Sequence, residues 1–418
     1  MIFFKLFFNI FLLLKINKTY ENHVIYPFKK VNNSQLTTLQ NLLQNDLQIT
    51  LEIGTPSQKM NLNLRSQAYA FFVSGSEVPY NIPKYNEKQS SSFKKDYPTA
   101  LSFKNLEYSK GYKISESLII NGEKIDNITL VLASQIIYFQ SGALGLKLVN
   151  NHEVSDDLSF IYQLKKSSNF DNYGFYLKYN DSGIGEIVIG TYPHLIDKNY
   201  NEKNFMYKST GTINRDINWV IDFDYFKYDN QIINNVTSIK SLINLEFGLI
   251  CAPLSMKSFF DELYLSNNFC HQNLVDEYYI YRCDLIKTKI ESFKNISFVL
   301  KEFNYTFNFS YKDLFIKKEK EYIFSIVFSS SQTKTNWIMG ETFLKKYQLV
   351  FDLDKKIIGT YIKINNETDP KKFNSLIIII IIFGILILFL VIYIFTQTKK
   401  KRKVRANELE DNYSPIPS

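Results

Sequence analysis

The stretch Trp337-Ile338-Met339-Gly340-Glu341-Thr342-Phe343-Leu344 decides the fold, together with the run from Tyr347 to Asp352 that follows it. A short apolar run ends at a glycine, and a brief helical pattern then leads to two apolar runs joined by the charged residues 354–356. This order predicts a strand, one turn of helix and a β-hairpin. Glycine fits where two backbones approach too closely for a side chain, so Gly340 predicts such a contact. An ordinary hairpin beside a helix would satisfy the same pattern.

Other stretches along the chain carry patterns that belong with this one. Residues 47–53 and 60–64 alternate apolar and polar side chains around the turn Gly54-Thr55-Pro56, which predicts a β-hairpin. The stretches 142–146 and 241–253 follow in order. Together these stretches resemble the pepsin-like aspartic proteases, and the resemblance covers residues 47–361. It implies an all-β, bilobal fold with a deep inter-lobe cleft. We therefore expect a leader at 19–45, an N-terminal lobe with inter-lobe strands at 46–200 and a C-terminal lobe at 201–365.

The two positions that carry the family's catalytic aspartates hold other residues here. Counted from Gly54 without a gap, Arg65-Ser66-Gln67 stands where the family has Asp-Thr-Gly, and counted back from Pro253, Asn244 stands at the second aspartate. The family's chemistry needs two carboxylates that share one proton. A guanidinium stays protonated and an amide does not titrate, so neither replacement can act as a general acid or base. The resemblance therefore implies a fold without an intact catalytic pair.

Two further residues are predicted at the cleft or its flap. Lys104 begins the segment that replaces the family's Tyr-Gly-Thr-Gly flap tip, and Glu246 lies two residues after Asn244. Glu246 either pairs with Arg65 across the cleft or is solvated separately. Arg65 itself is expected to favour an acidic group of a ligand. The literal Asp181-Ser182-Gly183 is rich in turn-forming residues, and we interpret it as a hairpin turn rather than a catalytic motif.

Both ends of the chain predict a membrane protein. Residues 1–18 contain a short apolar core typical of a signal peptide, and 376–395 form an uncharged stretch long enough for one transmembrane helix. The basic run 399–405 supplies most of the net charge of +8 and places the tail 396–418 in the cytoplasm. We therefore expect a single-pass type I protein of the secretory system or cell surface, with a luminal or extracellular ectodomain. The rest of the chain is near neutral and gives no indication of a nucleic-acid partner.

The resemblance also implies a disulfide between Cys270 and Cys283, which leaves Cys251 as a buried thiol. The histidines His23, His152, His194 and His271 show no metal-ligand spacing and are expected at the surface, so we predict neither a metal nor a cofactor. Glycosylation sites of the form Asn-x-Ser/Thr occur, among others, at Asn127, Asn235, Asn295, Asn304 and Asn308.

Three functions follow as hypotheses. The first is a membrane-tethered pseudoprotease that binds a peptide or protein in its cleft. The second is an active aspartic endopeptidase that uses non-standard residues. The third is a structural surface glycoprotein. The sequence leaves the oligomeric state and the ligand open.

Overall fold

A computed structural model describes residues 23–96, 101–102, 108–136, 140–148, 158–167, 170, 172–180, 184–213, 216–233, 239–266, 270–331, 335–362, 387, 391–394 and 398–399. The chain divides into two units, Met1–Ile362 and Lys363–Ser418, and the first unit contains the fold discussed below. Within the described residues no helix has the length and apolar character needed to cross a membrane. The predicted signal peptide 1–18, and all but five residues of the predicted span 376–395, lie outside them.

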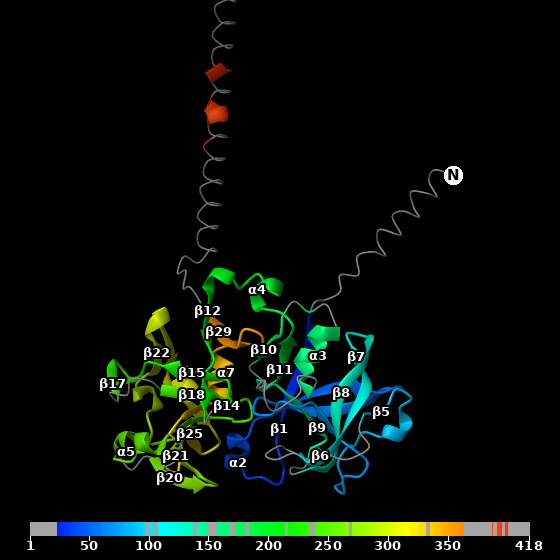
Figure 1. Ribbon diagram of the computed structural model, residues 1–418. Coiled ribbons are helices and arrows are strands. Elements are labelled where there is room, and N and C mark those ends of the chain that lie inside the picture. Colours follow the sequence, from blue (N-terminus) through cyan, green and yellow to red (C-terminus); the bar gives the residue numbers. More distant parts are fainter. Residues whose placement is uncertain are drawn as a thin grey trace, which may run out of the picture. The chain divides into compact units, whose positions relative to one another are not determined.

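The first and longest sheet runs through the N-terminal half of the unit and continues into the last strands of the chain (Figure 1). Its strands follow the order β12 (Phe205–Ser209), β29 (Ile357–Tyr361), β28 (Leu349–Asp352), β10 (Gly174–Tyr179), β11 (Ile184–Ile189), β1 (Val24–Val31), β2 (Asp46–Ile53), β3 (Gln58–Arg65), β9 (Gly142–Gly145), β4 (Phe72–Ser74), β8 (Glu123–Ile136), β7 (Tyr108–Ile120) and β5 (Lys94–Lys95), with β6 (Leu101–Ser102) beside β7.

The C-terminal half forms separate sheets. One has the order β15 (Val220–Phe223), β18 (Ile239–Ile243), β27 (Trp337–Met339), β19 (Ile250–Ala252), β26 (Ile326–Ser329), β21 (Tyr278–Asp284), β25 (Glu321–Phe324) and β24 (Phe315–Lys317), with β20 (Cys270–Val275) on β21. Another joins β17 (Gln231–Ile233), β16 (Tyr225–Tyr228), β22 (Ile296–Leu300) and β23 (Tyr305–Phe309), and β13 (Thr212–Ile213) pairs with β14 (Asp216–Ile217).

Helices are short and few among the described residues of this unit. The α-helices are α2 (Thr38–Leu43), α3 (Phe160–Ser167), α4 (Pro193–Ile196), α5 (Lys257–Tyr264), α6 (Tyr311–Leu314) and α7 (Glu341–Lys346). Single 3₁₀ turns occur at Glu87–Gln89, Glu202–Asn204, Leu254–Met256, Ile290–Ser292 and Lys301–Phe303. The unit is therefore mostly β, as the sequence predicted, and α7 follows β27 where the pattern at 337–344 placed a helical turn.

The predicted leader at 19–45 contains a strand and a helix where the structure describes it, and is not the irregular segment that was expected; its role as a leader stays a prediction. Residues 24–31 form strand β1, which pairs antiparallel with both β11 and β2 inside the long sheet. The side chains of Val24, Tyr26 and Phe28 are buried while the intervening ones are exposed, which is the strand period. Helix α2 follows and begins with a capping box at Thr37 and Gln40. This segment is part of the fold and not an irregular extension.

An aromatic cluster packs between the two halves of the unit. Trp219 is fully buried, and its indole N–H donates to the carbonyl oxygen of Leu146 at 2.8 Å. Its ring packs edge-on against Phe175 and Phe351, which stack on each other with centroids 4.7 Å apart. Trp219 directly precedes β15 in the C-terminal half, and Leu146 directly follows β9 in the N-terminal half. The cluster therefore stabilises the relative placement of the strands on which the site is built.

The predicted disulfide is confirmed. Cys270 and Cys283 lie directly opposite each other in the β20–β21 hairpin and are bonded. Cys251 is buried in β19, as expected.

Asp313 in α6 gives the fold a pH-dependent contribution. Desolvation opposes ionisation of this carboxyl, but hydrogen bonds from Lys346 at 2.5 Å and from Ser310 outweigh it and lower its pKa. A carboxyl whose pKa is lower in the folded state stabilises that state above its unfolded pKa, and the stabilisation is lost as the pH falls through the folded pKa. We expect Asp313→Asn to be less stable than the wild type at neutral pH and equally stable below that pKa. Urea unfolding at a series of pH values measures this, and a pH-independent gap between the two proteins would contradict it.

Candidate functional site

The first motif lies at the end of β3, where Arg65 is directly opposite Gly145 of the parallel strand β9. The Gly145 N–H donates to the carbonyl oxygen of Ala70 at 3.2 Å, five residues after Arg65. A Cβ atom on Gly145 would lie 2.3 Å from the backbone of Tyr69, so the crossing of β9 and the 68–70 loop requires glycine.

The second motif repeats this arrangement at the end of β18. Ile243 lies opposite Met339 of the parallel strand β27, so Asn244 comes next to Gly340. The Gly340 N–H donates to the carbonyl oxygen of Leu249 at 3.0 Å, again five residues after Asn244. The close backbone approach predicted at Gly340 is present, because a Cβ atom there would lie 2.2 Å from the carbonyl oxygen of Phe247. Arg65 and Asn244 therefore occupy equivalent positions of two copies of one motif.

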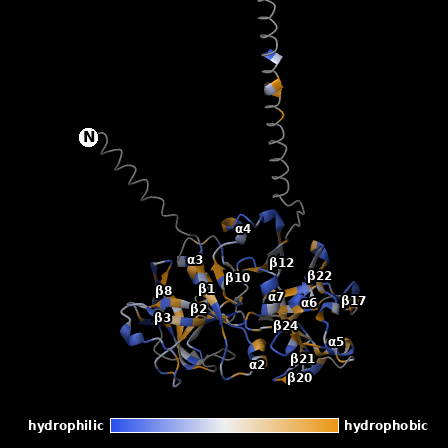
Figure 2. Cartoon of the chain, turned by 180° about the vertical axis from the view of Figure 1, so that it is seen from behind, coloured by the Kyte–Doolittle hydropathy of each residue, from blue (hydrophilic) through white to orange (hydrophobic). Residues whose placement is uncertain are grey.

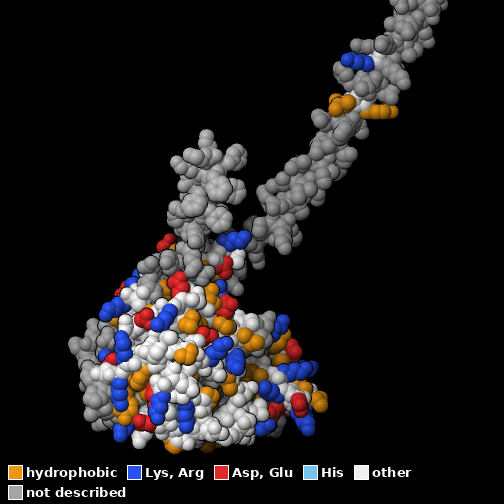
Figure 3. Space-filling view, turned by 90° about the vertical axis from the view of Figure 1, so that its right-hand side faces the viewer, with side chains coloured by type: hydrophobic (Ala, Val, Ile, Leu, Met, Phe, Trp, Pro, Cys, Tyr) orange, Lys and Arg blue, Asp and Glu red, His pale blue; other side chains and the backbone are white. Residues whose placement is uncertain are grey.

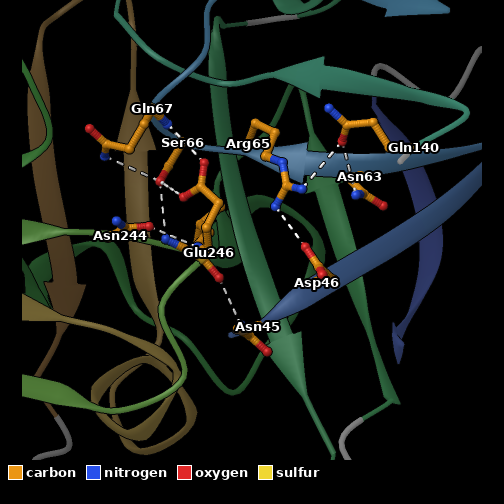
Figure 4. A network of polar contacts seen from close by, with 10 residues as sticks. Asn45, Asp46, Asn63, Arg65, Ser66, Gln67, Gln140, Asn244 and Glu246 are labelled. Carbon is orange, nitrogen blue, oxygen red and sulfur yellow. Dashed lines mark hydrogen bonds and ion pairs between the residues drawn. The ribbon is translucent and has the colours of Figure 1, made fainter. Parts of the chain in front are cut away.

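Arg65 is held by an ion pair within the N-terminal half. Its Nη1 lies 2.8 Å from Oδ1 of Asp46, at the start of β2, and its Nη2 lies 3.3 Å from Oε1 of Gln140 (Figure 4). The same Gln140 oxygen accepts from the Asn63 amide at 3.1 Å. The Arg65 side chain is only 10% exposed and that of Asp46 is 28% exposed. The partner carboxylate balances a positive charge that burial would otherwise make costly.

A second set of contacts links the two motifs directly. The Ser66 hydroxyl donates to the Glu246 carboxylate at 2.7 Å and accepts from the Leu245 N–H at 3.0 Å. The other carboxylate oxygen of Glu246 accepts from the Gln67 N–H at 3.0 Å. Ser66 and Glu246 belong to different halves of the unit, and Figure 4 shows their side chains pointing toward each other. The residues that follow Arg65 and Asn244 thus take part in a polar link between the two halves of the unit, which we call the motif link (Ser66, Gln67, Leu245 and Glu246).

Asn45, which directly precedes β2, contacts the second motif. Its side-chain amide donates to the carbonyl oxygen of Leu245 at 2.8 Å, and its backbone N–H donates to that of Glu246 at 2.9 Å. Asn45 is fully buried. Two consecutive residues, Asn45 and Asp46, therefore hold one motif each.

The predicted pairing of Glu246 with Arg65 is wrong, and so is the alternative of separate solvation. Both carboxylate oxygens of Glu246 accept from Ser66 and Gln67, whereas Arg65 pairs with Asp46. The physical reason is the hairpin: β2 and β3 pair with Gln48 opposite Asn63, which brings Asp46 level with Arg65. The guanidinium thus has a carboxylate partner from its own half of the unit.

Other predicted site residues lie apart from the motifs or outside the described residues. Lys104, Asn235, His152 and the turn 181–183 are outside them. The glycosylation sites Asn127, Asn295, Asn304 and Asn308 are exposed, and their modification stays a prediction. Of the histidines, His271 is exposed, His23 is half-buried, and His194 is half-buried beside Tyr361, whose hydroxyl lies 2.5 Å from Nδ1. Within the described part of the chain, no cluster of three or more His, Cys, Asp or Glu residues could hold a metal ion.

Sequence reasoning missed four residues that shape this site: Asn45, Asp46, Asn63 and Gln140. The register of the β2–β3 hairpin could have found Asp46, because extending the pairing from Ile53 and Gln58 down the strands places Asp46 opposite Arg65. Gln140 is 75 residues from Arg65 in sequence, and no local pattern points to it.

We expect Ser66→Ala to lower the free energy of unfolding by about 2 kcal/mol, because it leaves the buried Leu245 N–H without its acceptor and removes a hydrogen bond to a charged group. Ser66→Thr keeps the hydroxyl and is expected to retain most of the stability. Chemical unfolding of the three proteins checks this. Equal loss in the alanine and threonine variants would show that packing, not hydrogen bonding, matters here.

The charges of Arg65 and Asn244 limit the chemistry that these two positions can support. Arg65 carries a fixed positive charge and Asn244 a neutral amide, whose oxygen accepts from the Glu246 N–H at 2.8 Å. Proton transfer needs a group that can gain and lose a proton near the reacting atom. The two carboxylates in this network are already engaged, since Asp46 pairs with Arg65 and Glu246 accepts from Ser66 and Gln67.

Comparison with known proteins agrees with this geometry. The family model described as eukaryotic aspartyl protease matches residues 47–361. A protein named "Acid protease" from Saccharomycopsis fibuligera is 22% identical over 329 residues, which cover 74% of this chain and 79% of that protein. The matched region begins in β2, ends at the last residue of β29 and includes both motifs. The chain belongs to the eukaryotic aspartyl protease family.

Proposed function

We propose that this protein is a pepsin-like pseudoprotease, tethered to a membrane, that binds an extended peptide or protein segment between its lobes without cutting it. The observation that carries the proposal is the pair of equivalent positions Arg65 and Asn244, neither of which offers a carboxylate. Loss of general acid–base catalysis removes on the order of 10² to 10⁴ in rate for each group. The fold that would bind an extended peptide by strand-like pairing remains.

The Arg65–Asp46 pair supports a site without catalytic activity more strongly than a site that binds an acidic group of a ligand. Asp46 already provides the negative charge that a ligand was expected to bring to Arg65. We therefore propose that peptide binding depends on the strands around the motifs and not on Arg65. Arg65→Met combined with Asp46→Asn removes both charges together and is expected to leave peptide affinity unchanged.

A peptide carrying a fluorophore and a quencher tests binding and cleavage in one sample of the full-length protein in detergent. Binding raises the anisotropy of the fluorophore, and cleavage releases it from the quencher. The proposal predicts a rise in anisotropy at acidic and neutral pH without release. Release of the fluorophore that pepstatin blocks would contradict the proposed lack of catalytic activity. The absence of any binding across a varied peptide set would favour the hypothesis of a structural surface glycoprotein.

One observation favours an active endopeptidase as the second candidate. Glu246 places a carboxylate next to the two motifs, within hydrogen-bond distance of the Ser66 hydroxyl. Activity that disappears in Glu246→Gln would support this candidate. Activity that persists in that variant would point to a contaminating protease.

The membrane tether rests on the uncharged stretch 376–395 and the basic run after it. Alkaline carbonate extraction of cell membranes tests it: the full chain is expected in the pellet, and a chain ending at Ile362 in the supernatant or medium. Recovery of the full chain in the soluble fraction would contradict the tether.

A further inference from the structure

A basic hollow of about 750 Å³ is lined in part by α7, and no residue of the motif link belongs to its lining. Its walls come from β1, α6, β24 and α7, and Figure 2 shows α6, α7 and β24 next to one another. Gly248 and Leu249, just after the second motif, also line it. The volume lies within the range of pockets that hold small-molecule ligands.

Lysines dominate the charge of this hollow. Lys29 and Lys30 come from β1, Lys312 from α6, and Lys345 and Lys346 from α7. The lining holds two carboxylates, those of Asp313 and Glu341, so the positive charges exceed the negative ones by three.

Both carboxylates are already engaged by lysines of the hollow. Glu341, whose side chain is 7% exposed, lies 2.6 Å from Lys30 and 2.7 Å from Lys345, and Asp313 lies 2.5 Å from Lys346. Lys29 and Lys312 are exposed and take part in no ion pair between described residues. Two of the three excess charges are therefore carried by Lys29 and Lys312, whose side chains can turn toward a ligand, and the third arises because Lys30 and Lys345 share Glu341.

The rest of the lining is suited to a peptide rather than to a small anion. Leu42, Ile184 and Ile316 add apolar surface, and Ile184 is 50% exposed. Ile316 belongs to β24, the last strand in the order of its sheet, so one edge of β24 lies without a strand neighbour among the described residues. A free strand edge pairs with the main chain of an extended peptide, which an inorganic anion lacks.

Charge does not gather in this way on every face. On the face shown in Figure 3, lysine side chains are interspersed with acidic, apolar and uncharged ones. The positive excess of the hollow is thus a local feature that sets it apart from that face.

From these features we propose that the hollow binds an acidic segment of a partner protein, in which glutamate or aspartate residues alternate with aliphatic ones. The acidic side chains face Lys29 and Lys312, and the aliphatic ones lie on Ile184 and Ile316. This site is separate from the inter-lobe site proposed above and does not depend on it.

The test uses the full-length protein in detergent and a short fluorescent peptide in which glutamates alternate with leucines. We expect saturable binding by anisotropy that weakens at least about tenfold in the double variant Lys29→Glu/Lys312→Glu, because four units of charge change in the hollow. Raising the salt to about 1 M is expected to weaken binding to the wild type similarly, since exposed charges are screened over about 3 Å there.

The matched control reverses two other exposed lysines, Lys287→Glu/Lys289→Glu, which do not line the hollow. This variant is expected to bind within about twofold of the wild type, because its lysines lie outside the hollow and act on the peptide only through the net charge of the protein. Thermal unfolding shows that both double variants are folded. Equal weakening in the two variants, or unchanged binding in Lys29→Glu/Lys312→Glu, would overturn the proposal.

Two further samples separate the ligand classes. A glutamine–leucine peptide is expected not to bind, and inorganic polyphosphate is expected not to displace the acidic peptide at equal charge. Displacement by polyphosphate would overturn the assignment to a peptide. A peptide bound in the inter-lobe cleft would keep its affinity in Lys29→Glu/Lys312→Glu, so failure here is distinguishable from failure of the proposed function.

Discussion

Replacing Asp46 with alanine is expected to lower the free energy of unfolding by about 3 kcal/mol, because Arg65 then keeps its charge in a buried position without its carboxylate. Adding Arg65→Met to this variant removes the uncompensated charge and is expected to recover at least half of the loss. Chemical unfolding of the wild type, both single variants and the double variant gives the coupling energy between the two side chains.

A matched control lies on the same strand. Glu52 pairs with Lys59 at 3.8 Å, but Lys59 is 76% exposed whereas Arg65 is 10% exposed, so the control pair contains no buried cation. Glu52→Ala is therefore expected to cost less than about 1 kcal/mol. If Asp46→Ala costs no more than Glu52→Ala, the Arg65–Asp46 pair does not hold the first motif.

The second large effect is expected at Gly340. A Cβ atom there would lie 2.2 Å from the carbonyl oxygen of Phe247 and 2.3 Å from that of Leu249. These two oxygens accept from the N–H groups of Glu341 and Gly340, so neither can move away without breaking a hydrogen bond. Gly340→Ala should therefore destabilise the protein by at least about 3 kcal/mol. Its soluble yield and its unfolding midpoint measure the effect.

Gly211→Ala serves as the control, because the nearest atoms to its added Cβ are side-chain atoms of Val220 at 3.3 and 3.4 Å. Such contacts relax by small side-chain movements, so we expect a cost below about 1 kcal/mol. A Gly340→Ala protein as stable as Gly211→Ala would contradict the close backbone crossing in the second motif.

Much of the fold could be predicted because its strands carry strong local patterns. The stretch 337–344 predicted β27 and α7, and the turn Gly54-Thr55-Pro56 predicted the β2–β3 hairpin. Strand β1 was missed for a physical reason. Its alternation is brief and interrupted by Pro27, which lacks an N–H for a central strand, and polar residues follow it. Its place in the sheet depends on β11, more than 150 residues later in the chain.

The candidate site was predictable in position but not in its contacts. Counting residues from Gly54 and Pro253 located Arg65 and Asn244, and the repeated hydrogen bonds of Gly145 and Gly340 give both the same surroundings. The partners of these residues depend on register and on distant loops. Asp46 follows from the register of one hairpin. The contact of Gln140 with Arg65, and the motif link, form only when segments far apart in the sequence pack together. No local sequence pattern predicts them.

Whether this protein cuts a peptide bond depends on the chemistry available at Arg65 and Asn244. Mass spectrometry of a diverse peptide pool, incubated at acidic pH with the purified full-length protein, with and without pepstatin, measures this most directly. We predict an unchanged pool in both samples, because Arg65 and Asn244 cannot share and transfer a proton. New peptide ends that appear only without pepstatin, and that are absent from an identically purified Glu246→Gln sample, would contradict it.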